Sequence, residues 1–460
     1  MRKRNFWLTG IAAAAIVSMA LLLGCPTTDS EDDPPAAPSP GFYVDDVLTE
    51  VSAQTGGNLL ERSLTWLKTN AVDSGEYKIV LGEDITVTPI EVIEPTYDQR
   101  SSKIGIVLES RTLNNAVGVT LTLTSPSASA IKKIKLSDKG YLLHVGQRHP
   151  TGTGDIADVE AAITVVLENI TLEGLYNDKN GDKDNDQALI SVGGHDATVI
   201  MKTGSKITNN HNAANGQRKG GGLLIRAGRL VMQDGSIDTC YAESTDREGL
   251  GGAVCVIDFA QGVFTMNGGT ITGNIAKGNA GDGSRGGAVF VSQGSFKMTG
   301  GSITRNHIED VAANALGGAF GVWLSPTRVE LLGGSIKNNT ASTANGIAFP
   351  GLRLHGNVAT IGGKIEIADP IVVSNVPFKV ASDFDPIGQI QIDFNSAAPS
   401  DTYSGKVLLE WAEGGSGPLP VAKFKLGNYA ATGGTTSAPA VLTPITGDID
   451  PTTGVFTPTP

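Results

Sequence analysis

The chain has little of several things that binding proteins and enzymes commonly use. It contains 3 cysteines and 6 histidines, and aromatic residues make up only 5% of its 460 positions. Rings for stacking against sugars are therefore few. The formal net charge is −12, which argues against nucleic acid and anionic lipid head groups as partners, because both require a basic face.

The histidines are also too scattered to predict a zinc site. Zinc-binding histidines commonly lie two or four residues apart, on one face of a strand or helix. No two histidines of this chain have that spacing: His144, His149, His195, His211, His307 and His355.

What the chain does contain is a repeat over residues 200–368. One isoleucine can be chosen from each of six copies, at intervals of 30, 34, 32, 33 and 29 residues. A period of this size is typical of a solenoid. These anchor positions are Ile207, Ile237, Ile271, Ile303, Ile336 and Ile365.

Stacking the copies on these isoleucines produces columns of similar residues. Glycine stands two positions before the anchor in most copies, and asparagine stands three positions after it in four of them. The asparagines predict an internal ladder of amide hydrogen bonds at one bend; the alternative is a set of unrelated exposed turn residues. The ladder residues are Asn210, Asn274, Asn306 and Asn339, and Cys240 and Ala368 occupy the other two copies. The apolar column seven positions before the anchor is Ile200, Leu230, Phe264, Phe296, Val329 and Val358.

Apolar and polar residues alternate within each copy and are interrupted by Gly-Gly, which is strand and turn patterning. A single copy cannot bury its apolar positions. Copies that stack about 4.8 Å apart can pair their strands in parallel and merge their apolar columns into one core. The sequence therefore predicts an all-β parallel β-helix of nine to eleven coils.

Two motifs resemble those of a known family. The pairing of Gly252-Ala253-Val254 with Phe264-Thr265-Met266-Asn267-Gly268-Gly269-Thr270-Ile271 resembles the GGAI and F-x-x-N repeats of the polymorphic outer-membrane protein family. The resemblance implies a right-handed parallel β-helix of the pectate-lyase-like kind. In one respect the chain departs from the family, because its second motif carries Gly-Gly where the family has asparagine.

Residues 1–25 read as an export signal. Arg2, Lys3 and Arg4 precede an apolar run, and Leu22-Leu23-Gly24-Cys25 resembles a bacterial lipobox, in which Cys25 becomes the lipidated N-terminus. The alternative is an uncleaved membrane anchor. We therefore expect an exported lipoprotein of the cell envelope, lipid-anchored at the outer membrane or cell surface.

The remaining chain divides into four predicted regions. Residues 26–40 are rich in proline and aspartate and form a stiff tether. Residues 41–75 form a helical cap, whose helix follows the capping signal Asn58 to Glu61; a partner-binding helix is the alternative. Residues 76–375 form the β-helix, with regular repeats over 200–368, and residues 376–460 form a C-terminal cap and a loosely ordered tail.

Two smaller features suggest possible sites. Alternate oxygen-bearing side chains between positions 178 and 186 resemble a calcium loop, although the pattern departs from that of an EF-hand, and a solvated loop is the alternative. Calcium is the only cofactor that the sequence suggests, and its ligands would be Asp178, Asn180, Asp182, Asp184 and Asp186. Cys240 and Cys255 either form a disulfide or are free thiols that pack as small buried hydrophobic side chains.

No catalytic residues can be assigned from the sequence. Hydrolases with this fold usually carry Gly-His-Gly and paired aspartates, to which Gly194-His195-Asp196 is the nearest approach. Lyase-like charges exist but have no common placement: Asp258, Asp282, Arg285, Lys297 and Arg305. We therefore expect a non-catalytic display rod that binds a host molecule, a glycan or an envelope component through loops such as 241–250 and 276–285. The alternatives are a polysaccharide lyase or glycoside hydrolase, and a purely structural envelope protein.

Overall fold

The computed structural model divides the chain into two units, Met1–Ala37 and Pro38–Pro460, and almost everything that it describes belongs to the second. The described residues are 37–52, 56–93, 101–146, 162–257, 262–279, 283–311, 315–323, 327–343, 348–355, 359–374, 377–394, 406–430, 442–445 and 447–458.

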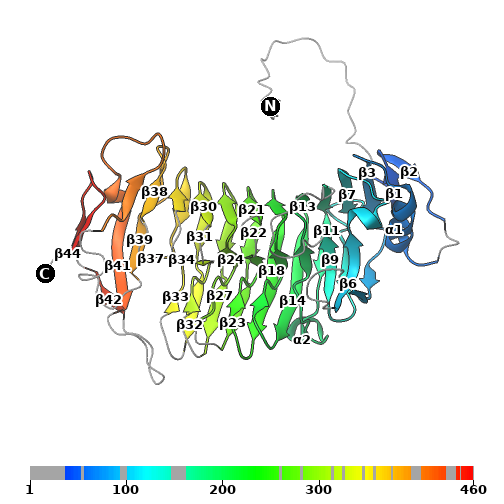
Figure 1. Ribbon diagram of the computed structural model, residues 1–460, viewed down its shortest axis with the longest axis horizontal. Coiled ribbons are helices and arrows are strands. Elements are labelled where there is room, and N and C mark those ends of the chain that lie inside the picture. The colour runs from blue at the N-terminus through cyan, green and yellow to red at the C-terminus, as the bar shows by residue number, and fades with distance from the viewer. Residues whose placement is uncertain are drawn as a thin grey trace, which may run out of the picture. The chain divides into compact units, whose positions relative to one another are not determined.

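The second unit is a right-handed parallel β-solenoid of about eight turns. Its strands form three long sheets, and Figure 1 shows the coils standing side by side in chain order. Each regular coil adds one strand to each sheet, as expected for a chain that buries its apolar residues by stacking. The fold class predicted from the repeat is confirmed.

Sheet A holds thirteen strands. In sheet order they are β2 (Val47–Thr49), β1 (Gly41–Val44), β3 (Glu76–Val80), β7 (Val119–Thr124), β10 (Ile163–Glu168), β13 (Ala197–Met201), β17 (Arg229–Met232), β21 (Val263–Met266), β25 (Ser295–Met298), β30 (Arg328–Leu331), β35 (Ala359–Ile361), β38 (Phe378–Val380) and β40 (Leu409–Trp411).

Sheet B holds twelve strands, of which three form a side branch. The main path is β4 (Ile85–Val87), β8 (Lys132–Leu136), β11 (Ile170–Glu173), β14 (Lys206–Ala214), β18 (Ser236–Ser244), β22 (Thr270–Thr272), β26 (Ser302–Thr304), β31 (Gly334–Lys337) and β36 (Ile365–Ile367). The branch leaves from β18 and contains β23 (Ile275–Gly278), β27 (His307–Asp310) and β32 (Thr340–Thr343).

Sheet C again holds thirteen strands. They are β5 (Ile90–Ile93), β6 (Ser101–Leu108), β9 (Tyr141–Val145), β12 (Ile190–Val192), β16 (Leu223–Ile225), β20 (Val254–Val256), β24 (Val289–Ser292), β29 (Phe320–Trp323), β34 (Leu352–His355), β37 (Ile371–Ser374), β39 (Ile390–Phe394), β41 (Phe424–Ala430) and β42 (Leu442–Pro444).

The remaining elements are short. They are the helices α1 (Leu59–Asn70) and α2 (Asn177–Asn180), the 3₁₀ turns η2 (Ser110–Thr112) and η3 (Val421–Lys423), and the strands β15 (Arg218–Lys219), β19 (Gly249–Leu250), β28 (Ala315–Leu316), β33 (Ala348–Phe349), β43 (Gly447–Ile449) and β44 (Phe456–Pro458).

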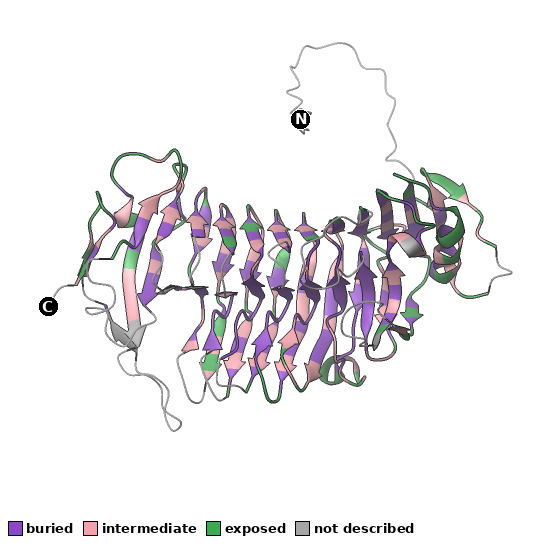
Figure 2. Ribbon diagram, viewed as in Figure 1, coloured by how far each residue is buried: buried purple, intermediate pink, exposed green. Residues whose placement is uncertain are grey.

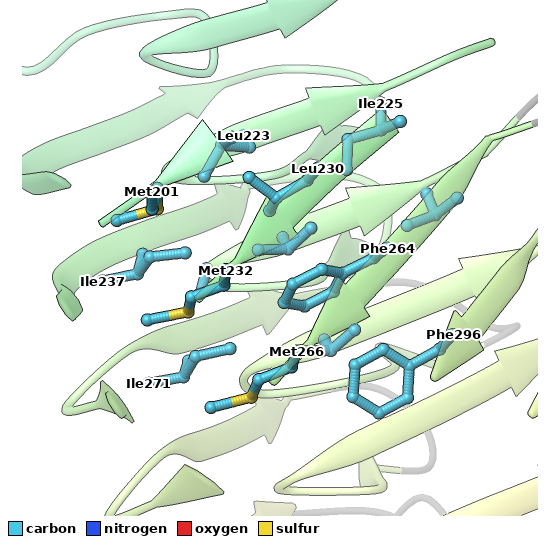
Figure 3. Close-up of a cluster of buried hydrophobic side chains, with 14 of the residues drawn as sticks. Met201, Leu223, Ile225, Leu230, Met232, Ile237, Phe264, Met266, Ile271 and Phe296 are labelled. Carbon is cyan, nitrogen blue, oxygen red and sulfur yellow. The ribbon is translucent and has the colours of Figure 1, made fainter. Parts of the chain in front are cut away.

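The core is the stack of columns that the repeat predicts. In sheet A, Phe264 pairs with Phe296 and Phe296 pairs with Val329, and all three side chains are at most 1% exposed. The rings of Phe264 and Phe296 lie 5.0 Å apart, a favourable distance for aromatic packing. Figure 3 shows these rings beside the methionine column that includes Met232, and Figure 2 shows how much of each strand is buried.

Three of the predicted column members were wrong by one or two positions. Val199, and not Ile200, pairs with Leu230, and Ala359, and not Val358, pairs with Val329. At the sixth anchor, Ile367 pairs with Ile336 in place of Ile365. Turns at the edges of the regular repeat differ in length by one or two residues, so a fixed offset from the anchor selects the wrong neighbour.

A further column of glycines, formed by Gly252, Gly287 and Gly318, is required by close contact between backbones. A Cβ atom at Gly252 would lie 2.2 Å from the carbonyl oxygen of Gly287, and one at Gly287 would lie 2.2 Å from that of Gly318. Only glycine fits such an approach. The alanines that follow these glycines in three copies, Ala253, Ala288 and Ala319, are fully buried.

The N-terminal end of the solenoid is closed by antiparallel strands and by α1. β1 pairs antiparallel with β3, and β5 pairs antiparallel with β6, so neither sheet begins with an open parallel edge. Asn58 caps the N-terminus of α1, and its side chain forms the predicted capping box with Glu61. Leu60 and Leu67 of α1 belong to the main core, and Trp66 packs 5.2 Å from Phe42.

The turn count is slightly lower than the predicted nine to eleven. Strands β38 and β40 continue sheet A, and β39 and β41 continue sheet C. Among the described residues, however, sheet B receives no strand after β36. The last coils therefore lack a third side, and apolar segments that resemble coils in the sequence do not complete full turns.

Candidate functional site

A fourth row of short strands, here called sheet D, covers part of the outer face of sheet C. β15 pairs with β19, and β28 pairs with β33. Arg285 bridges the two pairs through Leu250 and Leu316. The strands of sheet D lie between a strand of sheet B and the next strand of sheet C. In each of these coils the connecting segment contains two residues in extended conformation, which pair with those of a neighbouring coil.

Sheet D creates a second, smaller apolar cluster outside the solenoid core. Leu224, Cys255 and Phe290 point away from the main core and pack with Leu250 of sheet D. Each of these four side chains is at most 3% exposed. Burial of this kind fixes the loops that carry sheet D onto the rigid solenoid.

Next to sheet D lies a cavity of about 590 Å³, a volume within the range of about 300 to 1,000 Å³ that is common for ligand sites. A second cavity of about 220 Å³ adjoins it, and Gln217 lines both. We call the two cavities together the sheet C groove. Its walls come from β9, β15, β16 and the chain before β19 at one end, and from β24 and β29 at the other.

The larger cavity is basic, although the chain as a whole is acidic. Four of the described residues that line it are cationic and none is a carboxylate: Arg218, Lys219, Arg226 and Arg247. With a net charge of −12 spread over the chain, such a cluster is an unusual local charge. Low-dielectric walls concentrate its field at the cavity.

Arg218 is held in place by backbone carbonyls. Its Nε donates to Gly216 O at 3.1 Å, and its two terminal nitrogens donate to Asp186 O at 3.1 Å and Asn215 O at 2.5 Å. Burial lowers the pKa of Arg218, but an arginine keeps its charge in proteins. A fixed positive charge therefore stands at the cavity wall.

Amide side chains supply the other polar groups of the larger cavity, which is lined by Gln187, Asn212 and Gln217. Gln217 Nε2 donates to Glu248 Oε2 at 3.0 Å, and Asn212 Nδ2 donates to Gly220 O at 3.0 Å. Amides can both donate and accept hydrogen bonds, so this wall suits a ligand with hydroxyl groups. Tyr141 adds a ring to the same cavity.

Arg285 and Trp323 line the smaller cavity, and Arg353 lies on the same ring without being one of the described lining residues. The guanidinium of Arg285 lies 4.0 Å from the ring centre of Trp323, and that of Arg353 lies 5.6 Å from it. Cation–π contact of this kind fixes both partners. Phe290 and Ile257 complete an apolar wall.

Parts of the two segments predicted as binding loops contribute to this groove, although the structure places 241–244 in β18, 249–250 in β19 and 276–278 in β23. Arg247, Glu248 and Leu250 come from loop 241–250, and Arg285 comes from loop 276–285; residues 280–282 lie outside the described ranges. Sequence reasoning missed Gln217, Arg218 and Lys219, which form a polar run directly before a glycine triplet. That run was the available signal.

A second polar cluster lies on sheet B around His211, which sequence reasoning did not single out. His211 Nδ1 lies 2.9 Å from Asp184 Oδ1, and His211 Nε2 lies 2.9 Å from Glu243 Oε2. Burial alone would lower the pKa of His211, but the contacts with Glu243 and Asp184 outweigh it and raise that pKa. The hydrogen bond from His211 lowers the pKa of Glu243. The cluster thus joins the loop of α2 to two coils.

The structure brings three of the four predicted ladder asparagines into one chain of hydrogen bonds. Asn274 Nδ2 donates to Asn306 Oδ1 at 2.9 Å, and Asn306 Nδ2 donates to Asn339 Oδ1 at 3.0 Å. The ladder continues from Asn339 to Asp369 at 2.6 Å. No fixed offset from the anchors predicts this partner, because Ala368 stands three positions after Ile365 and Pro370 three positions after Ile367.

Asn210 belongs to a separate short ladder. Its Oδ1 accepts from Asn185 Nδ2 at 2.9 Å, a partner that sequence reasoning missed. Cys240 separates the two ladders, and its backbone N–H still donates to Asn274 Oδ1 at 3.0 Å.

The residues of the predicted calcium loop point to several local partners. Asp182 lies 2.7 Å from Lys135, Asp184 contacts His211, and Asn180 Oδ1 accepts from Asp182 N at 3.2 Å. Asp178 and Asp186 lie at the two ends of the segment. Within the described ranges, no three His, Cys, Asp or Glu side chains group closely enough to hold a metal ion. Calcium binding here stays a prediction. It is tested by adding calcium and measuring the melting temperature, which should rise if the loop binds the ion.

No disulfide joins Cys240 and Cys255. Both thiols are buried, and they lie on different sheets, Cys240 in β18 and Cys255 in β20. Cys240 packs in the main core, whereas Cys255 packs in the outer cluster beneath sheet D. Of the two alternatives that the sequence allowed, the structure therefore shows free thiols and no disulfide, because one thiol points into the solenoid and the other points out of it.

The charges considered for a lyase are spread over the molecule. Lys297 lies on sheet A, Arg305 follows a strand of sheet B, and Arg285 bridges sheet D. Asp258, Asp282 and the predicted lipidation site Cys25 lie outside the described residues.

The fold and site define a right-handed parallel β-helix with a basic, amide-lined groove on one face. Comparisons with protein-family models, with curated proteins and with solved structures find no match for this chain. Among the described helices, none has the length and apolar character needed to cross a membrane.

Proposed function

We propose that this chain is a non-catalytic surface lipoprotein, a β-helical display rod that binds a glycan, host or envelope partner as an adhesin does. The observation that carries the proposal is the sheet C groove, whose larger cavity measures about 590 Å³ and is walled by cationic and amide side chains. Loops on a rigid scaffold are a common location for binding, and here sheet D pins those loops to the solenoid.

The composition of the groove supports binding more than catalysis. A hydrolase needs two carboxylates on either side of the scissile bond. The larger cavity has no carboxylate among its described lining residues, and Glu248 of the smaller cavity is hydrogen-bonded to Gln217. Arginine, lysine and amide side chains bind a ligand through charge and hydrogen bonds, and none of them supplies the paired carboxylates of a hydrolase.

Envelope anchoring is supported by the N-terminal sequence. The basic start, the apolar run and Leu22-Leu23-Gly24-Cys25 together fit lipidation of Cys25. Mass spectrometry of the N-terminal peptide from cells tests it. We expect a diacylglyceryl adduct in the wild type and none in Cys25→Ala; an intact, unmodified N-terminus in the wild type contradicts lipidation and favours the uncleaved membrane anchor.

The likeness of the repeats to those of the polymorphic outer-membrane protein family also supports a display role. The repeats supply the rigid rod, and the groove residues come largely from the segments around sheet D. A rod of this kind lifts its loops away from a membrane to which the chain is tethered.

The function is tested by applying the full chain in detergent to a glycan array and assaying product release from the same glycans. We expect retention of at least one glycan class without new reducing ends or unsaturated sugars. Release of either product would establish the lyase or hydrolase alternative. Absence of any glycan retention would remove glycans as the partner class.

A further inference from the structure

We infer that the ligand of the sheet C groove is an acidic polysaccharide, whose carboxylate or sulfate groups are bound directly by arginine and lysine. The inference rests on the proposed binding function and adds the chemical class of the ligand. It comes from the contrast between a basic cavity and an acidic chain, with a net charge of −12.

The chemistry of the cavity distinguishes among anionic ligands. Arg218, Lys219, Arg226 and Arg247 line the larger cavity, and none of its described lining residues is a carboxylate. Asp186 and Asp246 lie behind this wall near Arg218, and Asp246 accepts a hydrogen bond from Gly216 N at 2.6 Å. Guanidinium groups pair with carboxylates and sulfates in a forked geometry. Charge alone would also suit an acidic peptide or a nucleic acid.

Polar groups between the charges favour a sugar. Gln187 and Asn212 line the larger cavity, and such amides match the alternating donors and acceptors of sugar hydroxyls. DNA has no 2′-hydroxyl groups for these amides to bind. A peptide would need apolar pockets for its side chains. Among its described lining residues the larger cavity offers only Leu224 and Tyr141, but the smaller cavity has an apolar wall, so a polyglutamate probe decides between a peptide and a sugar.

The shape of the groove fits an extended chain. The two cavities meet at Gln217 and reach from Tyr141 in β9 to Trp323 in β29, and the strands between them, β12, β16, β20 and β24, follow one another in sheet C. Neighbouring strands lie about 4.8 Å apart, so five strand steps correspond to roughly 24 Å. Several linked sugars can lie along that distance.

The test compares the wild-type full chain with two variants in a binding titration. Lys219→Gln/Arg247→Gln removes two charges from the groove, at side chains that no described hydrogen bond requires. Arg229→Gln removes an exposed charge from sheet A and is the control. The probes are polygalacturonate, heparin, neutral dextran, polyglutamate and single-stranded DNA.

We expect the wild type to bind polygalacturonate or heparin and the groove variant to bind it roughly tenfold more weakly, with Arg229→Gln unchanged. Rising salt should weaken the wild-type complex, because exposed charges are screened. Equal binding of dextran, or equal loss in both variants, overturns the acidic ligand while leaving glycan binding in place. Tighter binding of polyglutamate or DNA overturns the sugar assignment. Binding to none of the probes overturns the inference, and the glycan array then decides the proposed function separately.

Discussion

At the scale of single residues, the buried amide ladder shows why one side-chain type recurs at one bend. Asn306 donates to Ile271 O, to Thr304 O and to Asn339 Oδ1, and its own Oδ1 accepts from Asn274. Every polar atom of this buried side chain thus has a partner. The same pattern at each coil satisfies turn carbonyls that water cannot reach.

Loss of one ladder residue should therefore be costly. In Asn306→Ala, buried carbonyls and the neighbouring amides lose their partners, and we expect the free energy of unfolding to fall by about 3 kcal/mol. Urea denaturation measures it. The control Asn267→Ala removes an exposed asparagine that bonds only Thr299 at the surface and should cost less than about 0.5 kcal/mol. Equal losses in the two variants would show that the ladder is not stabilising.

Cys240 occupies the position in its coil that asparagine occupies in the neighbouring coils of the ladder. Its Sγ lies 3.3 Å from Asp238 O and 3.9 Å from Ile207 O, the same two carbonyl positions that Asn274 Nδ2 reaches one coil later.

We expect Cys240→Asn to join the two ladders and raise the free energy of unfolding by about 1 kcal/mol, since it adds hydrogen bonds at a prepared site. Cys255→Asn, the same change in the apolar outer cluster, should lower it by about 2 kcal/mol. Chemical denaturation of both variants gives the answer, and destabilisation by Cys240→Asn would contradict the reading of that site.

At the scale of elements, His211 joins segments that are distant in sequence. It contacts Asp184 in the loop after α2 and Glu243 in β18, and Asp186 of the same loop accepts a hydrogen bond from Arg218 in the groove. The position of one groove wall therefore depends on a histidine contact outside the groove.

This contact should make stability depend on pH. Because the pKa of His211 is raised in the folded chain, its contribution is fully present below the unfolded value of about 6.5 and is lost as pH rises through the folded value. We expect the destabilisation caused by His211→Gln to be larger at pH 5.5 than at pH 8.5, by urea denaturation. His307, whose pKa is lowered by burial, is the control, because His307→Gln should show the opposite slope. A destabilisation by His211→Gln that does not change with pH would rule out a charged His211.

At the scale of the whole molecule, each coil contacts mainly the coils on either side. Ala288 lies beside Ala319 and Val289 pairs with Phe320, so residues 289–319 make one full turn. Stability of such a chain is close to a sum of coil and interface terms.

Deletion of residues 289–319 should therefore preserve the fold. The splice places Phe264 next to Val329 and Asn274 next to Asn339, which keeps both columns continuous. We expect an unchanged circular dichroism spectrum per residue and a smaller denaturant dependence, because less surface is buried. Deletion of residues 289–303, about half a turn, should give an unfolded or aggregated chain. Equal behaviour of the two deletions would contradict a register set by whole coils.

The repeat itself determined the parallel β-helix, the stacking of Phe264 on Phe296, and the close glycine contacts. These follow from local spacing, since an apolar side chain with a fixed place in each coil must meet its equivalent in the next. The capping box at Asn58 is equally local, because a helix start is decided within four residues.

The tertiary structure alone decided where the turns change length and which loops meet. At the sixth copy Ile367, and not Ile365, pairs with Ile336. Cys240 packs in the main core from sheet B, whereas Cys255 of sheet C packs in the outer cluster. The groove joins Tyr141, Arg218 and Arg247 from different coils. Such contacts depend on the path of each loop in space, and the period of a sequence fixes how coils stack but not how the loops between them fold back.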